Sequence, residues 1–591
     1  MRRRTSRARG SRGKRAAGRA ARPRPYSHRL RLRVAFTVLT LVALGLLGRA
    51  AELQLVERGF LTQQGDARSS RVTTLLAHRG DITDRNGEPL AVSTPVDSVW
   101  ADPQQLQQQL EDLPRLASVL GVDRAELTRR VTSNMDRQFL YLKRGVDPAE
   151  ARRVAALDVP GVKLTREYRR YYPAGEVTGH VLGFTSIDDS GQEGLELAFN
   201  RWLAGKDGAE RVIQDSTGQK VEDVESVREV RPGRDLALSL DLRIQYLAYR
   251  ELKRAILANR AHAGSVVVID VNTGEVLAMV NQPAYNPNDR GQFTPADYRN
   301  RAVTDLFEPG SSIKPFIVAA GLSSGRFSTH SLVNTNPGYV QVADRIFRDE
   351  HNLGVIDLAT VLARSSNVGM IKLEQQLQPR QIWSTLSRFG FGQITDSGLP
   401  GESAGVFTNY AHWRPISVAT LSHGYGLSVT PLQLASAYAT IGALGVHHPV
   451  SILRVDSPPP DERVLDAHVA QELIGLLQAV TTQEGATGVK ASIPGYRVAG
   501  KTGTAWKFIN GAYSTDHFTS VFAGVAPASA PRLAAVVVID DPTAGHHQGG
   551  DVSAPVFSAV VGGALRLLGV APDDVAPPAS PLLPGQQVAL R

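Results

Sequence analysis

The most pronounced hydrophobic feature of the chain is an uncharged run near its start, at residues 34–48. As a helix, these 15 residues span ~22 Å, against the ~30 Å hydrocarbon core of a bilayer. Four leucines extend the apolar pattern on both sides: Leu30, Leu32, Leu53 and Leu55. We therefore predict a single transmembrane helix over residues 30–51. The alternative is a cleaved signal peptide, although no small-x-small cleavage motif follows Gly48.

The pattern after this run predicts a first folded domain over residues 52–235, with short strands and turns at both of its ends. Residues 104–120 and 147–157 carry apolar positions at helical spacing. Asp123 and Asp147 are candidate N-caps of helices in this part of the chain. The pattern changes near residue 235, where we place the domain boundary.

Residues 236–570 are predicted to form a second domain of the α+β class. Asp241 is placed to cap an amphipathic helix over residues 242–261. Apolar runs of strand length occur near both ends of the domain: residues 265–270, 276–281 and 532–540. The first two flank Asn272-Thr273-Gly274, which is typical of a hairpin. Strands at both ends with helices between them predict one sheet built from distant parts of the chain.

Composition and charge place the two ends of the chain outside these domains. Fourteen Lys and Arg residues, and no Asp or Glu, lie in residues 1–33; the remainder holds 52 basic and 57 acidic residues. The net charge of +9 therefore belongs to a tail, residues 1–29, which we expect to be cytoplasmic by the positive-inside rule rather than to bind nucleic acid. Residues 571–591 contain five prolines and are predicted to be disordered.

The chain has no cysteine. Disulfides, thiolate metal sites, iron-sulfur clusters and cysteine nucleophiles are excluded, so covalent catalysis requires another residue.

One candidate nucleophile is Ser311, in the motif Ser311-Ser312-Ile313-Lys314. Pro309-Gly310 predicts a turn before an apolar helical run, so Ser311 is expected at a helix start, where free backbone N–H groups favour developing negative charge. Lys314 then lies one turn later on the same face. Ser-x-x-Lys alone is a weak pattern, because Ser11-Arg12-Gly13-Lys14 in the basic tail also fits it.

Two further short motifs occur later in the same domain. Ser365-Ser366-Asn367 comes after a helical run and places a hydroxyl and an amide two residues apart. Lys501-Thr502-Gly503-Thr504 lies between apolar flanks that indicate a strand. Residues 495–502 also have the spelling of a phosphate-binding loop, but the residues before them are not strand-like and Gly503 after them opposes a helix.

Ser-x-x-Lys, Ser-x-Asn and Lys-Thr-Gly in this order are the signature of penicillin-binding proteins and serine β-lactamases. The chain resembles the class B penicillin-binding proteins from the anchor to residue 570, and among them the division-specific members. The segments that carry the resemblance are RGDITDRNG, REYRRYYPAGEVTGHVLGFT (residues 166–185), FEPGSSIKP, RSSNVGM, GYGLSVTPLQLA and GYRVAGKTGTA.

The resemblance implies an architecture and a location. Residues 52–235 would form the family's elongated non-catalytic pedestal, of the dimerisation type. Residues 236–570 would form the penicillin-binding transpeptidase fold, a mixed sheet with helices on both faces and a helical subdomain. The family is anchored in the bacterial inner membrane with the catalytic domain in the periplasm at the division septum. Its partners are a membrane glycosyltransferase of the FtsW type and other division proteins.

The resemblance also implies a chemistry for the motif residues. Ser311 would attack the D-alanyl-D-alanine carbonyl of a stem peptide, with Lys314 as its base, Ser365 passing the proton on and Asn367 orienting lysine and substrate. The terminal carboxylate of the substrate would be bound by one strand: Lys501, Thr502, Gly503 and Thr504. An amine of a second stem peptide would resolve the acyl-enzyme, and β-lactams would acylate the same serine. No cofactor is implied.

Some features leave alternatives open. His546 and His547 stand where relatives often carry aromatic residues, and adjacent histidines without further ligands rarely form a metal site, so we expect no metal. A β-lactamase would share two motifs but lack the pedestal. An elongation-specific transpeptidase or a D,D-carboxypeptidase of the same superfamily, and an inactive division scaffold, are the remaining alternatives.

Overall fold

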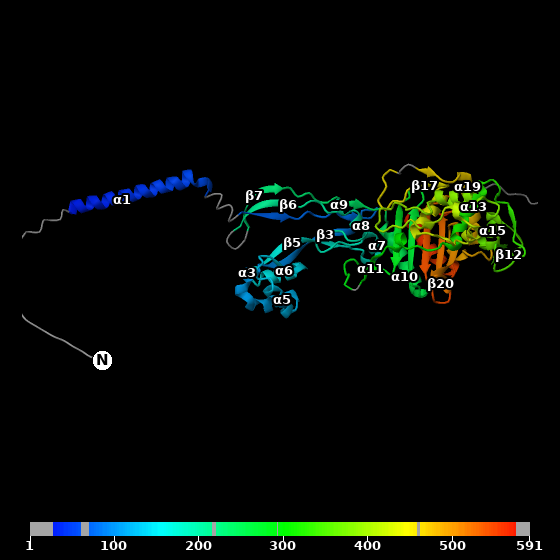
Figure 1. The fold of residues 1–591 in the computed structure, drawn as a ribbon, viewed down its shortest axis with the longest axis horizontal. Coiled ribbons are helices and arrows are strands. Elements are labelled where there is room, and N and C mark those ends of the chain that lie inside the picture. The colour runs from blue at the N-terminus through cyan, green and yellow to red at the C-terminus, as the bar shows by residue number, and fades with distance from the viewer. Residues whose placement is uncertain (1–27, 61–69, 215–219, 292, 458–460, 575–591) are drawn as a thin grey trace, which may run out of the picture. The chain divides into compact units, whose positions relative to one another are not determined.

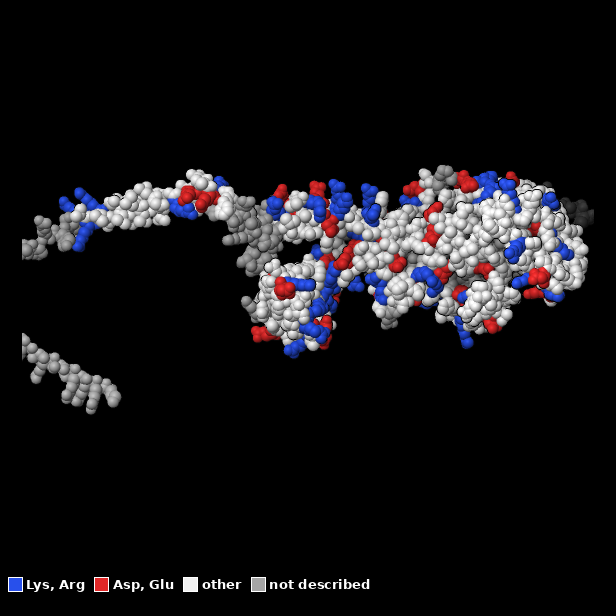
Figure 2. Space-filling model, in the orientation of Figure 1, with Lys and Arg blue, Asp and Glu red and all other residues white. Residues whose placement is uncertain are grey.

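The computed structural model describes residues 28–60, 70–214, 220–291, 293–457 and 461–574, and divides into two compact units. The smaller unit contains α1 (His28–Ala51), which continues into the short helix η1 (Glu52–Val56). Figure 2 shows that the middle of α1 carries no charged side chain, with basic residues at its start. Among the described residues, this one helix is long and apolar enough to cross a membrane, over Arg29–Val56. The predicted apolar N-terminal helix is therefore present, and most of the basic tail lies outside the described residues.

The smaller unit also contains a three-stranded sheet in the order β1-β6-β7. Its strands are β1 (Ser70–Leu75), β6 (Gly208–Gln214) and β7 (Lys220–Arg228). β6 and β7 are antiparallel neighbours, with Ala209 opposite Arg228.

The larger unit begins with the pedestal, built around the 13-residue strand β3 (Pro89–Ala101). Four shorter strands complete its sheet: β2 (Ile82–Thr83), β4 (Leu140–Val146), β5 (Val162–Tyr171) and β8 (Leu236–Ala237). β2 and β8 pair in parallel, whereas β3 pairs antiparallel with β4 and β5. The helices packed on this sheet are α3 (Pro103–Leu106), α4 (Leu113–Leu120), α5 (Arg124–Thr132) and α6 (Pro148–Ala155), and the 3₁₀ helix η2 (Gln107–Asp112) joins α3 to α4.

The caps predicted from the sequence are present in the pedestal. The carboxylate of Asp123 accepts a hydrogen bond from the Glu126 backbone N–H, and that of Asp147 accepts two at the start of α6. The helix expected over residues 104–120 is instead broken into α3, η2 and α4, with non-helical backbone at Gln109. Pro114 contributes to this break, because proline is accepted in the first turn of a helix but not in its interior.

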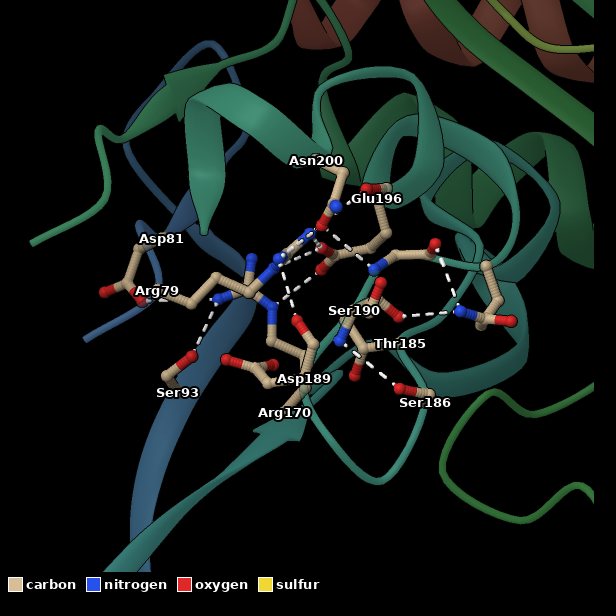
Figure 3. A network of polar contacts seen from close by, with 12 residues as sticks. Arg79, Asp81, Ser93, Arg170, Thr185, Ser186, Asp189, Ser190, Glu196 and Asn200 are labelled. Carbon is tan, nitrogen blue, oxygen red and sulfur yellow. Dashed lines mark hydrogen bonds and ion pairs between the residues drawn. The ribbon is translucent and has the colours of Figure 1, made fainter. Parts of the chain in front are cut away.

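A buried ion network holds the pedestal segments together (Figure 3). Arg79 Nε and Arg170 Nε each donate to the carboxylate of Glu196, at 2.7 and 2.6 Å, and all three side chains are at most 1% exposed. Arg79 also donates to the backbone oxygen of Asp189 and to Asn200. Glu196 lies in α8 (Gly194–Ala198) and Asn200 in α9 (Asn200–Leu203), which follow the short elements η3 (Gly175–Val177) and α7 (Gly179–Leu182) in the chain. Two arginines thus share one buried carboxylate.

The region after the pedestal, in which the sequence predicts the catalytic site, is built on a five-stranded sheet in the order β10-β9-β21-β20-β19. Its strands are β9 (Ala263–Asp270), β10 (Val276–Gln282), β19 (Ala499–Ile509), β20 (Ala512–Ala526) and β21 (Leu533–Asp540). Figure 1 shows the green strands from the start of the region beside the orange and red strands from its end, as the sequence predicts. Every neighbouring pair is antiparallel, so the mixed sheet implied by the resemblance is here an antiparallel one.

Alternating residues of the strands face two separate cores. Val266 and Val268 pack with α10 (Leu242–Ala258) and α21 (Ala554–Leu567), whereas Val267 and Ile269 face the opposite core. Because side chains alternate along a strand, an uninterrupted apolar run identifies a sheet that is covered on both faces.

Most helices of the region belong to the second core or to the subdomain beside it. They are α11 (Pro295–Tyr298), α12 (Arg301–Thr304), η4 (Gly310–Ile313), α13 (Lys314–Ser323), α14 (Leu358–Ala363), α15 (Asn367–Glu374), α16 (Pro379–Arg388), η5 (Tyr410–His412), α17 (Pro415–Leu421), α18 (Pro431–Gly442) and α19 (Ala467–Thr482). The short helices η6 (Val489–Ala491) and α20 (Gly549–Val552) pack in the first core, with α10 and α21. Four two-stranded sheets accompany them: β11 (Leu332–Asn334) with β14 (Val355–Asp357), β12 (Tyr339–Val342) with β13 (Arg345–Arg348), β15 (Val406–Phe407) with β16 (Leu427–Ser428), and β17 (Val446–His447) with β18 (Glu462–Arg463).

The start of the proline-rich tail differs from its prediction as a disordered segment. The carboxylate of Asp573 accepts hydrogen bonds from the Arg497 backbone N–H, at 2.7 Å, and from the Ser529 hydroxyl, at 2.6 Å. These contacts fix residues beyond 571 against the catalytic region. The rest of the predicted tail lies outside the described residues.

Candidate active site

The three motifs predicted from the sequence meet at one cavity of about 640 Å³. Ser311 contributes to its lining from η4, Ser365 from the turn before α15, Asn367 from the first position of α15, and Thr502 and Thr504 from β19. Lys314 and Lys501 belong to the same motifs but are fully buried. Segments separated by more than 180 residues in sequence therefore form a single site.

Ser311 lies in the 3₁₀ turn η4, immediately before α13 begins at Lys314. Gly310 before it has φ of +55°, and a Cβ at this position would lie 2.9 Å from the Thr504 backbone oxygen. A Cβ on Gly503, across the contact, would lie 2.5 Å from the Pro309 oxygen. The two glycines allow the turn that carries Ser311 to lie directly against β19.

Lys314 makes its hydrogen bonds to the Ser-x-Asn motif. Its Nζ donates to the Ser365 backbone oxygen at 2.7 Å, to Asn367 Oδ1 at 2.8 Å and to Ser365 Oγ at 3.3 Å. Ser311 Oγ is not among these partners. The sequence places Lys314 within reach of Ser311, but in the structure its hydrogen bonds go to Ser365 and Asn367. Burial lowers the pKa of Lys314 to about 7, although the nearby carboxylate of Asp349 opposes the shift.

Ser365 Oγ lies between the two buried lysines. Lys501 Nζ donates to it at 3.0 Å, and also to Oγ1 of Thr502 at 3.2 Å. Burial, and then the positive charge of Lys314, hold the pKa of Lys501 well below its ordinary value. Ser365 itself has φ of +55°, a conformation that non-glycine residues rarely adopt and that is common at functional sites.

Lys501, Thr502, Gly503 and Thr504 all lie in β19, so the phosphate-loop alternative is wrong: the chain continues past the lysine as a strand, to Ile509. Thr502 Oγ1 is 2.7 Å from Thr487 Oγ1, and Thr504 Oγ1 accepts a hydrogen bond from the Gly549 backbone N–H. These contacts fix both threonine hydroxyls at the wall of the cavity.

Asp349 is a site residue that the sequence analysis missed. Its carboxylate accepts hydrogen bonds from the Ser366 hydroxyl, at 2.5 Å, and from the backbone N–H groups of Asn367 and Val368. It therefore holds the first turn of α15, which carries Asn367. Asp349 comes just after a small hairpin, 17 residues before its partner, and no motif marks it.

The two histidines noted in the sequence lie at the cavity or near it. His547 contributes to the lining and stacks on Phe518, with ring centroids 3.8 Å apart. Within the part of the chain that the structure describes, no group of three or more His, Asp and Glu side chains is arranged to hold a metal ion. His547 thus supplies a ring where the family resemblance leads us to expect an aromatic residue.

Comparison with known proteins agrees with this geometry. The penicillin-binding protein transpeptidase domain matches residues 264–562, and the penicillin-binding protein dimerisation domain matches residues 74–238. The peptidoglycan D,D-transpeptidase FtsI of Escherichia coli K12 is 44% identical over 89% of this chain and 90% of its own length. The probable peptidoglycan D,D-transpeptidase PbpC of Pseudomonas aeruginosa is 42% identical over 91% of this chain and 95% of its own.

The fold is also similar to those of solved structures. Penicillin-binding protein 3 of Mycobacterium tuberculosis, complexed with aztreonam, has a TM-score of 0.66 and 29% identity over 85% of this chain and 98% of its own. The transpeptidase domain of Burkholderia pseudomallei penicillin-binding protein 3 has a TM-score of 0.53 and 40% identity, over 57% of this chain and 97% of its own. With both domain families and relatives covering nearly its whole length, the chain belongs to the penicillin-binding proteins that join a dimerisation domain to a transpeptidase domain.

Proposed function

We propose that the chain is a peptidoglycan D,D-transpeptidase that cross-links stem peptides of the septal cell wall through an acyl-enzyme on Ser311. One observation carries the proposal: the nucleophile, two buried lysines and the Ser-x-Asn motif meet at one cavity. The relatives named D,D-transpeptidases support the reaction class.

In the acylation step, Ser311 Oγ attacks the carbonyl of the D-alanyl-D-alanine bond. Lys314 takes the hydroxyl proton, and a pKa of about 7 leaves a substantial neutral fraction to do so at neutral pH. Ser365, between the lysines, returns a proton to the nitrogen of the departing D-alanine. The C–N bond breaks as the ester to Ser311 forms.

Substrate recognition is assigned to β19. Lys501, Thr502 and Thr504 bind the terminal carboxylate, and Gly503 lets the strand approach the turn that carries Ser311. The backbone N–H groups of Ser311 and Thr504 form the oxyanion hole, which stabilises charge on the attacked carbonyl oxygen. Asn367, held by Asp349, orients Lys314.

The location and partners are inferred from the anchor and the relatives. The α1 helix anchors the chain in the inner membrane, with the catalytic region in the periplasm at the septum. The glycan strands come from a partner, a membrane glycosyltransferase of the FtsW type, with other division proteins assembled around it. β-Lactams acylate Ser311 in place of the stem peptide, as the aztreonam complex of a structural relative supports.

Mass spectrometry of the purified chain after benzylpenicillin tests the assignment. One adduct is expected, on Ser311, and Ser311→Ala abolishes it. Ser11→Ala, in the tail motif with the same spelling, leaves it unchanged. An adduct that survives Ser311→Ala refutes the nucleophile. Rapid release of penicillin would favour a β-lactamase, and a folded parent chain without any adduct would favour the inactive scaffold.

A further inference from the structure

A second cavity, of about 600 Å³, lies at the end of the catalytic sheet. Trp506 of β19 lines both this cavity and the one that holds Ser311. The second cavity also includes Glu308, which precedes Ser311 by three residues. The second cavity is thus adjacent to the site of acylation and shares Trp506 with it, but does not include the motif residues.

The half-buried carboxylate of Glu308 is bound by neutral donors. Its Oε1 accepts hydrogen bonds from the Gly426 backbone N–H, at 2.9 Å, and from the Tyr513 hydroxyl, at 3.0 Å. Among the described residues, no Lys, Arg or His forms an ion pair with it. Burial raises the pKa of Glu308, which reflects a charge that is only partly compensated.

The cations in the wall of this cavity are paired elsewhere. Arg299 and Arg301 contact Asp305, at 2.9 and 3.0 Å, and Lys507 contacts Asp540 at 2.7 Å. These contacts leave Glu308 as a carboxylate available to a cation from outside the chain.

Tyr513, which donates to this carboxylate, belongs to a row of three aromatic rings. The ring of Tyr513 lies edge-on to that of Tyr425, with centroids 5.2 Å apart, and Tyr425 is next to Trp506 at 6.4 Å. The Trp506 backbone N–H donates to the Tyr425 hydroxyl, which fixes these two rings to each other. Trp506 is 48% and Tyr513 44% exposed. Ring faces attract ammonium groups, and more strongly when an anion is nearby.

We propose that Glu308, together with Tyr425, Trp506 and Tyr513, binds the ammonium group of the acceptor stem peptide. The assignment rests on the proposed transpeptidase function, which requires an amine as its second substrate. A carboxylate at the end of a row of aromatic rings recognises a primary ammonium by charge and by its N–H donors. The position beside Ser311 places the acceptor close to the acyl-enzyme.

The second half of the reaction consumes this amine. The ammonium first releases one proton to solvent. The neutral nitrogen then attacks the acyl carbonyl, a C–N bond forms, and the bond from that carbon to Ser311 Oγ breaks. The second proton of the nitrogen is passed on to Ser311 Oγ, which restores the free serine. Glu308 binds and orients the amine and forms no covalent bond with it.

The test compares acylation with aminolysis in Glu308→Gln. Glutamine keeps an oxygen for the Gly426 and Tyr513 donors but removes the charge. The benzylpenicillin acylation rate is expected to stay within about 2-fold of the parent. With a thioester donor and a stem tetrapeptide that has a free side-chain amine, the KM for the amine is expected to rise about 10-fold, the equivalent of one charge-assisted contact. The rate of acyl-enzyme hydrolysis stays unchanged.

Two further variants sharpen the result. Trp506→Leu removes an aromatic wall and is expected to raise the same KM, whereas Glu462→Gln, an exposed carboxylate on β18, leaves it unchanged. An unchanged KM in Glu308→Gln overturns the acceptor site while the proposed function stands. Loss of acylation in Glu308→Gln also overturns the acceptor-site proposal, because Glu308 would then be needed before the acceptor binds. Absence of acylation in the parent refutes the proposed function itself.

Discussion

The pedestal and the active site both bury charged side chains, but they compensate them differently. In the pedestal, Arg79 and Arg170 share the carboxylate of Glu196, with both contacts under 2.8 Å. In the active site, Lys314 and Lys501 are equally buried, and their hydrogen bonds go to neutral oxygens of serine, threonine and asparagine. In the pedestal, the carboxylate compensates the buried guanidinium charges, so the charged forms are retained in the folded state. The arrangement in the active site destabilises the charged form of a lysine and so prepares a base.

The largest expected effect comes from restoring a permanent charge in the active site. Lys314→Arg keeps the positive charge at similar reach, but a guanidinium does not lose its proton at working pH. We expect the second-order rate of benzylpenicillin acylation to fall by at least ~10²- to 10⁴-fold, the usual cost of losing a general base.

Lys501→Arg is the matched control for this prediction. Its role in the proposal requires charge and donors, so the loss of acylation should be smaller. Thermal unfolding of both variants checks that they are folded. If Lys314→Arg acylates at close to the parent rate, Lys314 is not the base.

In the pedestal, removing the shared charge is expected to affect stability and not chemistry. Glu196→Gln leaves two buried guanidinium groups without their carboxylate, which costs about 3–5 kcal/mol of the free energy of unfolding. Urea unfolding of the purified chain measures this, and acylation per folded molecule should remain at the parent value. Glu225→Gln breaks an exposed pair with Arg211 and should cost less than about 1 kcal/mol. Equal losses in the two variants would contradict the contrast between buried and exposed pairs.

The smallest effect concerns the one carboxylate close to Lys314. Acylation should rise with pH through about 7, because the neutral form of Lys314 is the reactive one and increases above its pKa. Asp349→Asn removes the charge that raises this pKa, so the rise should move to lower pH. The other titratable groups near the site include His423, whose pKa burial lowers to about 3, Lys501, and the cavity residues Tyr425, Glu350, His351 and His547.

The maximum rate in Asp349→Asn should fall as well, since the start of α15 loses the charge behind three hydrogen bonds. Ser366→Ala removes one of these bonds and keeps the charge. It therefore serves as a control whose pH profile should stay in place. A profile that moves equally in both variants would show that the shift comes from α15 and not from the carboxylate.

Local patterns in the sequence were sufficient for the caps, the hairpin and the motifs. Asp123, Asp147 and Asp241 cap helices as predicted, and the turn at Asn272 joins two apolar strands. Such features depend on residues a few positions apart, where periodicity and turn chemistry are informative.

Features that depend on distant contacts were missed. Asp349 reaches the Ser-x-Asn motif only through the fold of a small hairpin, and Glu308 is distinguished only by the lack of an ion pair with any residue that the structure describes. The antiparallel arrangement of the five-stranded sheet likewise depends on which strands pair in the fold, and strands far apart in the sequence pair there. The contact of Lys314 with Asn367, 53 residues away, has no local signature.

The central claim is that burial, with hydrogen bonds to neutral oxygens and no carboxylate bonded to Nζ, makes Lys314 a base at neutral pH. Its most direct test is an NMR titration of the chain with ¹³C-labelled lysine side chains, with Lys314→Arg used to assign the signal. The account predicts that Lys314 loses its proton with a midpoint at about 7. A Lys314 signal that stays protonated up to pH 9 would contradict it.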